Sequence, residues 1–212
     1  MIEIAPSVLA AHPLYVARDV GRLLDAGITL LHLDIMDGHF VPNISFGPAM
    51  VNALHQQYPD IRLDVHLMLS RPASLLDAFI KAGASEITLH SEAEGDLRAL
   101  LQTVRAAGLR AGLSIKPATA VDTVLPYLDV LDLVLIMSVE PGFGGQKLMA
   151  DTLSKMGQLR QAGFQGALSV DGGVKQDNAG IVKRAGATRL VMGTAAFTAP
   201  DPRAFLAAVR QA

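Results

Sequence analysis

Three features of the sequence predict a single α/β domain, residues 1–212, built as a closed (β/α)8 TIM barrel. Short apolar runs rich in β-branched residues alternate with longer amphipathic stretches along the chain. Eight such pairs fill the 212 residues, and many of the amphipathic stretches end in Ala-Gly or a similar pair. Apolar strands that alternate with helices form parallel sheets covered on both faces. Eight units close naturally into a barrel, whereas the competing open, doubly wound sheet has no special need for eight.

The expected strands are the eight apolar runs. They lie near Glu3–Leu9, Thr29–Asp34, Arg62–Met68, Glu86–His90, Arg110–Ile115, Leu133–Ser138, Ala167–Asp171 and Arg189–Gly193. The expected helices lie near Pro13–Ala26, Pro48–Gln57, Pro72–Ala82, Asp96–Ala107, Ala120–Leu128, Ala150–Gln161, Asp177–Ala185 and Asp201–Gln211. Pro48 and Pro72 fit first-turn positions, and Asp201-Pro202 fits an N-cap followed by proline at N1. Glycines follow several helices, where a C′ glycine is expected, at Gly27, Gly83, Gly108, Gly163 and Gly186.

The composition excludes several classes of function. Half of the residues are apolar, and 18 basic against 20 acidic side chains leave a net charge of −2, which provides no footprint for nucleic acid or anionic lipid. The chain has no cysteine, so disulfides, thiolate metal sites and cysteine nucleophiles are excluded. The first residues lack the pattern of a signal peptide, and no apolar run approaches the ~18 residues of a membrane span. We therefore expect a cytoplasmic protein that binds neither nucleic acid nor membranes.

Four ligand-type side chains are expected at one end of the barrel. The second strand ends in His32-Leu33-Asp34, the third contains His66, and the seventh ends at Asp171. Residues two apart on a strand share a face, so His32 and Asp34 both point inward if Leu33 faces the helices. A core hydrogen bond for each histidine and a turn for Asp171 are the alternatives. Taken together, two imidazoles and two carboxylates predict one divalent metal ion per subunit: zinc, iron, cobalt or manganese.

Glycine-rich segments follow the last three strands and indicate a bound phosphate. They are Gly142-Phe143-Gly144-Gly145, Gly172-Gly173 and Gly193-Thr194. Glycine lets backbone N–H groups approach an anion closely, and barrels often bind phosphate in these loops. Ordinary turns are the alternative for any one segment.

Methionine and histidine side chains also recur at the strand ends. Met36, Met68 and Met137 fit either core packing or an apolar shelf beside the reacting carbons. His90 ends the fourth strand and fits either a substrate contact or a structural hydrogen bond.

Five segments closely resemble the ribulose-phosphate 3-epimerase family. They are Ile4–Leu9 (IAPSVL), His32–Asn43 (HLDIMDGHFVPN), Leu63–Met68 (LDVHLM), Met137–Lys147 (MSVEPGFGGQK) and Val170–Gly173 (VDGG). The resemblance runs from residue 4 to about residue 198 in register with all eight units. Thr194 stands where many members carry serine, and the stretch from Met156 to Ser169 is shorter than usual.

The resemblance implies a role for each matching residue. His32, Asp34, His66 and Asp171 would ligate the metal, and Asp34 and Asp171 would also be the acid/base pair. Ser7 and His66 would contact the substrate. The glycine segments with Thr194 would surround the phosphate and sugar, and the three methionines would lie over the reacting carbons. The family forms dimers and hexamers, so a homo-oligomer is expected.

The implied reaction interconverts D-ribulose 5-phosphate and D-xylulose 5-phosphate in the pentose phosphate pathway. A proton leaves C3 on one face and another returns on the opposite face, through an enediolate whose charge a metal ion would stabilise. Three alternatives stay open. One is a sister epimerase acting on another ketose phosphate, such as D-allulose 6-phosphate. The second is a phosphate-binding lyase or decarboxylase using Lys116, and the third is a non-catalytic binding protein.

Overall fold

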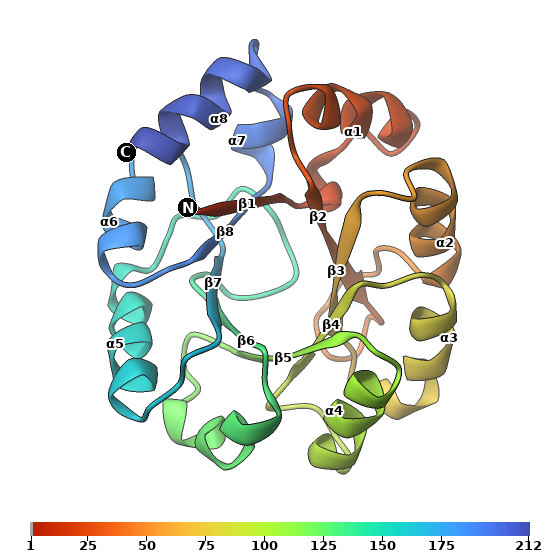
Figure 1. The fold of residues 1–212 in the computed structure, drawn as a ribbon, viewed down its shortest axis with the longest axis vertical. Coiled ribbons are helices and arrows are strands. Elements are labelled where there is room, and N and C mark those ends of the chain that lie inside the picture. The colour runs from red at the N-terminus through yellow and green to blue at the C-terminus, as the bar shows by residue number, and fades with distance from the viewer. Residues whose placement is uncertain (1) are drawn as a thin grey trace.

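The computed structural model describes residues 2–212, and its centre is a single eight-stranded parallel sheet (Figure 1). The strands are β1 Glu3–Pro6, β2 Leu30–Met36, β3 Arg62–Met68, β4 Glu86–His90, β5 Arg110–Ile115, β6 Leu133–Met137, β7 Ala167–Asp171 and β8 Arg189–Met192. From β2 to β8 each strand pairs with the next in sequence, and β1 pairs with β8. A parallel bridge between Ser7 and His32 joins β1 to β2. The predicted (β/α)8 barrel is confirmed.

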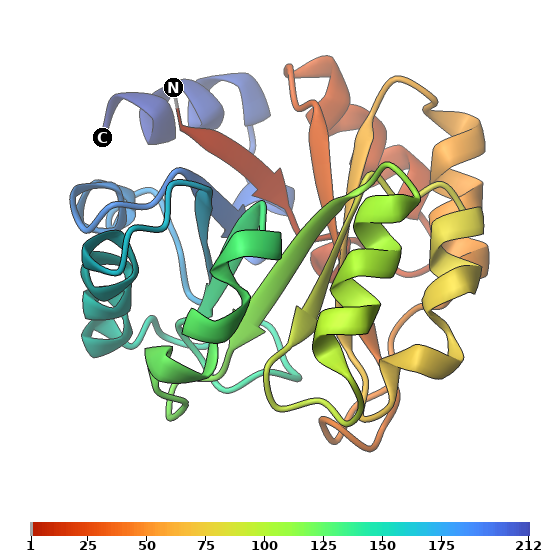
Figure 2. The ribbon, with the colours of Figure 1, turned by 60° about the horizontal axis from the view of Figure 1, so that its bottom comes forward.

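The helices surround the strands on the outside, as Figure 2 shows. The α-helices are α1 Val16–Asp25, α2 Pro48–Gln57, α3 Leu76–Lys81, α4 Leu97–Ala106, α5 Ser154–Gln161, α6 Ala179–Arg184, α7 Thr194–Phe197 and α8 Pro202–Gln211. Short 3₁₀ helices occupy Val8–Ala10, Pro72–Ser74, Val121–Thr123, Leu125–Val130 and Ala150–Leu153. No helix within residues 2–212 is long and apolar enough to cross a membrane.

The predicted helices Pro48–Gln57, Asp96–Ala107, Asp177–Ala185 and Asp201–Gln211 agree with α2, α4, α6 and α8 to within two residues at each end. The α-helices α1, α3 and α5 begin three or four residues later than predicted, and 3₁₀ helices occupy Pro72–Ser74 and Ala150–Leu153. Pro48 opens α2, and the Asp201 side chain accepts a hydrogen bond from the amide of Ala204 at the start of α8. The five glycines expected after helices all adopt positive φ, between 81° and 112°, which is the left-handed conformation of a C′ residue.

The predicted helix Ala120–Leu128 is wrong, because this segment forms two 3₁₀ helices separated at Val124. Pro126 lies in this segment. It has no amide hydrogen for an α-helical bond to Asp122, and its ring would clash with the Asp122 carbonyl. The first strand is also shorter than predicted, since it ends at Pro6 and the chain turns into the Val8–Ala10 helix. The short helix α7 was not predicted.

The described residues form three buried apolar clusters, the smallest of which contains Met36, Val41 and Met68. The largest apolar cluster lies between the strands and the helices and includes Leu33, Leu67 and Phe79. A smaller apolar cluster includes Leu135 and Val191. Buried polar and charged side chains lie alongside it and project from the strands, and some of these form the candidate site.

Candidate metal centre and active site

Four side chains meet at the C-terminal ends of three strands. His32 and Asp34 come from β2, His66 from β3 and Asp171 from β7. One nitrogen or oxygen atom of each lies within 4.8 Å of the corresponding atom of all the others. Leu33 packs in the outer apolar cluster, so the alternation along β2 turns its two polar neighbours inward. The structure therefore brings together all four residues predicted as ligands.

His32 is held from behind by a carboxylate. Its Nδ1 lies 2.8 Å from Oδ2 of Asp64, which leaves Nε2 facing Asp34 Oδ1 at 3.3 Å and Asp171 Oδ2 at 3.8 Å. Among the described residues, this buried Nε2 has no hydrogen-bond partner of good geometry. Burial lowers the pKa of His32, but Asp34 and Asp64 outweigh it and raise the pKa well above its usual value. Positive charge is therefore favoured at this point.

His66 is oriented by a chain of two further side chains. Its Nε2 lies 2.9 Å from Nε2 of His90, whose Nδ1 lies 3.1 Å from Oε2 of Glu92. Burial lowers the pKa of His90 to about 4, so its ring is neutral near pH 7. It donates from Nδ1 to Glu92 and accepts at Nε2 from His66. The other ring nitrogen of His66, Nδ1, faces Asp34 Oδ1 at 3.1 Å and Asp171 Oδ2 at 4.0 Å.

The donor set therefore fits a divalent cation. Two imidazole nitrogens and two carboxylate oxygens face one buried point. A proton on His32 supplies one positive charge there, and a divalent ion would supply two and displace that proton. Two nitrogen and two oxygen donors suit zinc and other first-row metals. The four residues could hold such an ion.

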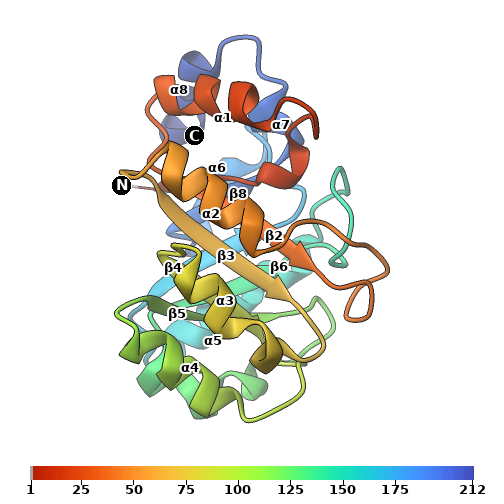
Figure 3. The ribbon, with the colours of Figure 1, turned by 90° about the vertical axis from the view of Figure 1, so that its right-hand side faces the viewer.

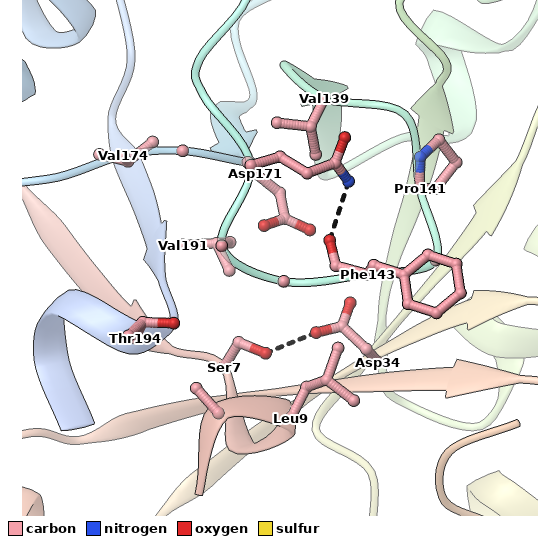
Figure 4. A pocket seen from close by; sticks show the side chains of 18 of the residues that line it. Ser7, Leu9, Asp34, Val139, Pro141, Phe143, Asp171, Val174, Val191 and Thr194 are labelled. Atoms are coloured by element: carbon pink, nitrogen blue, oxygen red, sulfur yellow. Dashed lines mark hydrogen bonds between the residues drawn. The ribbon is translucent and has the colours of Figure 1, made fainter. Parts of the chain in front are cut away.

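The two carboxylates differ in proton affinity. Burial and then the charge of Asp34 raise the pKa of Asp171 to about 6. Burial also acts to raise the pKa of Asp34, but His32 and His66 outweigh it, and the pKa falls below its usual value. Figure 4 shows both carboxylates turned toward the same space, with Ser7 bonded to Asp34. Asp171 therefore holds a proton more readily than Asp34, which stays ionised.

A cavity opens beside these two carboxylates. It is lined by Ser7, Leu9, Ala10, Asp34, Met36, Met68, Met137, Val139, Pro141, Gly142, Phe143, Gly144, Gly145, Gln146, Asp171, Gly172, Gly173, Val174, Lys175, Val191, Gly193, Thr194 and Ala195. The predicted glycine segments and all three methionines are among them. His32, His66 and His90 are fully buried and do not line it. His90 therefore has the structural hydrogen bonds that were one of its two interpretations.

The loop after β6 is held over the cavity by contacts that the sequence did not reveal. The side chain of Gln146 donates to the carbonyls of Glu140, at 2.7 Å, and Phe143, at 2.9 Å. Asn43, in the loop after β2, donates to the carbonyl of Gly142 at 2.7 Å. Figure 3 shows both loops projecting from the same side of the barrel. Gln146 and Asn43 lie within the segments that carried the family resemblance, and this was the available signal.

The pair Gly172-Gly173 packs against the same loop so closely that no side chain fits. Gly173 has a φ of +66°, and a Cβ there would lie 2.2 Å from the amide nitrogen of Leu148. A Cβ on Gly172 would lie 2.5 Å from the side chain of Val139. The unpredicted helix α7 begins at Thr194, which lines the same cavity. The N–H groups of Ala196 and Phe197 donate to the carbonyl of Gly193, which leaves those of Thr194 and Ala195 without an intrahelical partner.

Together the fold and the site define a (β/α)8-barrel protein with an imidazole–carboxylate centre beside a glycine-lined cavity. The model of the ribulose-phosphate 3 epimerase family matches residues 3–197, and the chain is an enzyme of that family. It is 39% identical over 215 residues to the ribulose-phosphate 3-epimerase of Bacillus subtilis, covering 99% of both chains. It is 41% identical over 202 residues to that of Escherichia coli K12, covering 93% of this chain and 90% of the relative.

Solved structures of lower identity share the fold. A 3-keto-L-gulonate-6-phosphate decarboxylase from Vibrio cholerae aligns over 100% of this chain and 95% of its own, with a TM-score of 0.74 and 16% identity. A 3-hexulose-6-phosphate synthase aligns over 99% of this chain and 98% of its own, with a TM-score of 0.69 and 18% identity. These matches support the barrel and carry no inference about the reaction.

Proposed function

We propose that this enzyme interconverts D-ribulose 5-phosphate and D-xylulose 5-phosphate by exchanging the proton on C3 between the two faces of the sugar. The supporting observation is the pair Asp34 and Asp171, two carboxylates from β2 and β7 whose pKa values are shifted in opposite directions. Two carboxylates of unlike proton affinity that face one space are suited to a general base and a general acid.

Asp34 is the base for D-ribulose 5-phosphate in this proposal, and Asp171 is the acid. The C3–H bond breaks, its proton passes to Asp34, and its electron pair moves toward the C2 oxygen to form an enediolate. Asp171 then gives a proton to C3 from the opposite face. No electron is gained or lost, and the two carboxylates exchange roles in the reverse direction.

His32, Asp34, His66 and Asp171 are the proposed ligands of one divalent ion, which could be zinc, iron, cobalt or manganese. When bound, the ion would supply Lewis-acid stabilisation for the negative charge that develops on the substrate oxygens. Ser7 orients Asp34 through its 2.5 Å hydrogen bond. The buried methionines Met36, Met68 and Met137 give the cavity an apolar surface that excludes water from the reacting carbons.

The phosphate group is assigned to the glycine segments, at Gly142–Gly145, Gly172-Gly173 and Gly193-Thr194. Three loops line the cavity there, and α7 begins in the same wall with Thr194 and Ala195. Backbone amides and helix N-termini bind phosphate without a basic patch, which agrees with the net charge of −2.

A Schiff-base lyase is disfavoured by the position of Lys116. Its ammonium lies 3.9 Å from the centroid of the Phe40 ring, and Lys116 does not line the cavity. Borohydride treatment with substrate should therefore leave Lys116 unmodified.

The relatives named ribulose-phosphate 3-epimerase support a five-carbon substrate, so parallel assays should find a higher kcat/KM with D-ribulose 5-phosphate than with D-allulose 6-phosphate.

Deuterium exchange tests the two-carboxylate assignment directly. Asp171→Asn should abolish epimerisation yet still exchange the C3 proton of D-ribulose 5-phosphate with D₂O. Asp34→Asn should likewise abolish epimerisation yet still exchange the C3 proton of D-xylulose 5-phosphate with D₂O. Mass spectrometry of the recovered sugars measures both. Near-normal turnover in either variant with metal bound would rule the assignment out.

We further propose that residues 1–212 fold as one domain and assemble as a homo-oligomer, a dimer or a hexamer. Light scattering of the purified enzyme measures the assembly, and a single cooperative unfolding transition would support the single domain.

A further inference from the structure

A cluster of buried charges lies at the end of the barrel opposite the catalytic carboxylates. Arg189, the first residue of β8, donates to three carboxylates on three other strands. Its Nε lies 2.7 Å from Glu3 on β1, its Nη1 lies 3.1 Å from Asp64 on β3, and its Nη2 lies 3.0 Å from Glu86 on β4. This guanidinium thus spans the interior of the barrel and uses both of its terminal nitrogens.

Removing these charged groups from water costs free energy. Arg189 and Glu86 are fully buried and Asp64 is 1% exposed. A buried ion pair often contributes no more stability than well-packed apolar residues would. Two partly exposed arginines supply further cations, since Arg62 pairs with Glu3 and Arg110 with Glu86.

Asp64 differs from the other two carboxylates in having only one arginine. Among the described residues its Oδ1 has no hydrogen-bond partner. Its Oδ2 accepts two hydrogen bonds, from Arg189 Nη1 at 3.1 Å and from His32 Nδ1 at 2.8 Å. One oxygen atom therefore joins the buried guanidinium to the imidazole whose other nitrogen faces Asp34.

We propose that Arg189 is a positioning residue, which holds the Asp64 carboxylate so that His32 donates from Nδ1 and presents Nε2 to the metal centre. Carboxylates behind a metal-binding histidine fix its tautomer and ring orientation. The proposal rests on the metal centre of the proposed function and extends it to the far end of the barrel. Arginine suits the position because its planar fork reaches three carboxylates at fixed angles, which the single ammonium of lysine does not.

Metal affinity tests this role without any activity assay. Co²⁺ is titrated into chelator-treated protein and followed by its visible absorption. Arg189→Met should weaken Co²⁺ binding by about 10–100-fold, the usual effect of losing such a partner, and Arg189→Lys should have an intermediate effect. The matched control is Arg62→Met, which removes an arginine that contacts Glu3 in the same cluster but not Asp64. It should bind Co²⁺ within about threefold of the wild type, well below the effect expected at Arg189.

A double variant separates positioning from stability. Arg189→Met/Glu86→Leu removes the arginine together with one buried carboxylate, so it relieves the uncompensated charge and should recover much of the thermal stability. If Arg189 positions Asp64, Co²⁺ binding stays weak in this double variant. If affinity returns with stability, or if Arg189→Lys and Arg189→Met bind Co²⁺ like the wild type, the proposal is overturned. If Arg189→Met fails to fold, the Co²⁺ affinities of Arg189→Lys and of the double variant test the proposal.

A second readout remains informative even if the wild type binds no Co²⁺, which would count against the metal centre itself. In protein with ¹⁵N-labelled histidine, the Nδ1–H of His32 should give a low-field proton signal in the wild type and in Arg62→Met. The signal should weaken or vanish in the Arg189 variants. An unchanged signal there would overturn the positioning role independently of any metal.

Discussion

The hydroxyl of Ser7 donates to Oδ2 of Asp34 at 2.5 Å, across the junction where the first and second strands close the barrel. Ser7 therefore links the end of β1, where the barrel closes, to Asp34, the proposed base. A hydrogen bond donated to a carboxylate favours its ionised form. Ser7 therefore favours the ionised form of Asp34 and fixes the orientation of its side chain.

Ser7→Ala should lower kcat/KM roughly tenfold to 100-fold, because a hydrogen bond to a charged group is worth about 1.5–3 kcal/mol. Steady-state kinetics measure the effect. The control is Ser74→Ala, which also removes a serine hydrogen bond, to the carbonyl of Arg71, but on the exposed surface. Equal activity of the two variants would show that Ser7 does not orient Asp34.

Asn43→Ala should raise KM about two- to tenfold, since it removes one neutral hydrogen bond worth about 0.5–1.5 kcal/mol. This bond joins the loop after β2 to the carbonyl of Gly142 and so holds one wall of the cavity. Asn52→Ala, on an exposed position of α2, should leave KM unchanged. A KM for Asn43→Ala equal to that of the wild type would contradict the role of the contact.

Gly173→Ala should destabilise the protein more than Gly108→Ala, as measured by urea unfolding. Both glycines have positive φ, at +66° and +81°, so both variants carry backbone strain of about 1–3 kcal/mol. Only at Gly173 would the new Cβ meet backbone, at 2.2 Å from the Leu148 nitrogen, whereas nothing lies within 4 Å at Gly108. Equal losses would mean that the close packing of this loop is not required.

Removal of metal should lower both activity and thermal stability, because an ion that binds only the folded state stabilises it by about 2.7 kcal/mol at 100 times its Kd. Chelator treatment followed by calorimetry, with and without added Co²⁺, measures this. His32→Gln should abolish the shift, and His55→Gln, on an exposed helix position, should keep it. A melting temperature unaffected by chelator and by Co²⁺ would argue against the centre.

Stability should depend on pH through Glu92. Burial acts to raise the pKa of Glu92, but hydrogen bonds from His90, from Thr119 and from the amide of Lys116 outweigh it and lower the pKa from 4.5 to about 2. A carboxyl with a lowered folded-state pKa stabilises the fold fully above pH 4.5 and loses that contribution as the pH falls toward 2. The stability difference between the wild type and Glu92→Gln should therefore be constant near neutrality and shrink below pH 4.5. A difference that grows on acidification would refute this.

The sequence alone determined the barrel and the members of the site. Period-two alternation turned His32 and Asp34 inward, and the predicted ends of β2, β3 and β7 identified Asp34, His66 and Asp171. These signals are local: strand periodicity, C′ glycines and proline positions depend on residues close in the chain. The prediction failed at Ala120–Leu128, where the apolar spacing of a helix hid the effect of Pro126.

Only the tertiary structure decided how these residues interact. Arg189 was a strand residue with no assigned role, and it contacts Asp64, 125 positions away along the chain. The opposite pKa shifts of Asp34 and Asp171 also arise in three dimensions, since they depend on burial and on charges brought in from other strands. A periodic pattern shows which face of a strand a side chain occupies. Its hydrogen-bond partners and its pKa depend on the distances between strands that closure of the barrel creates.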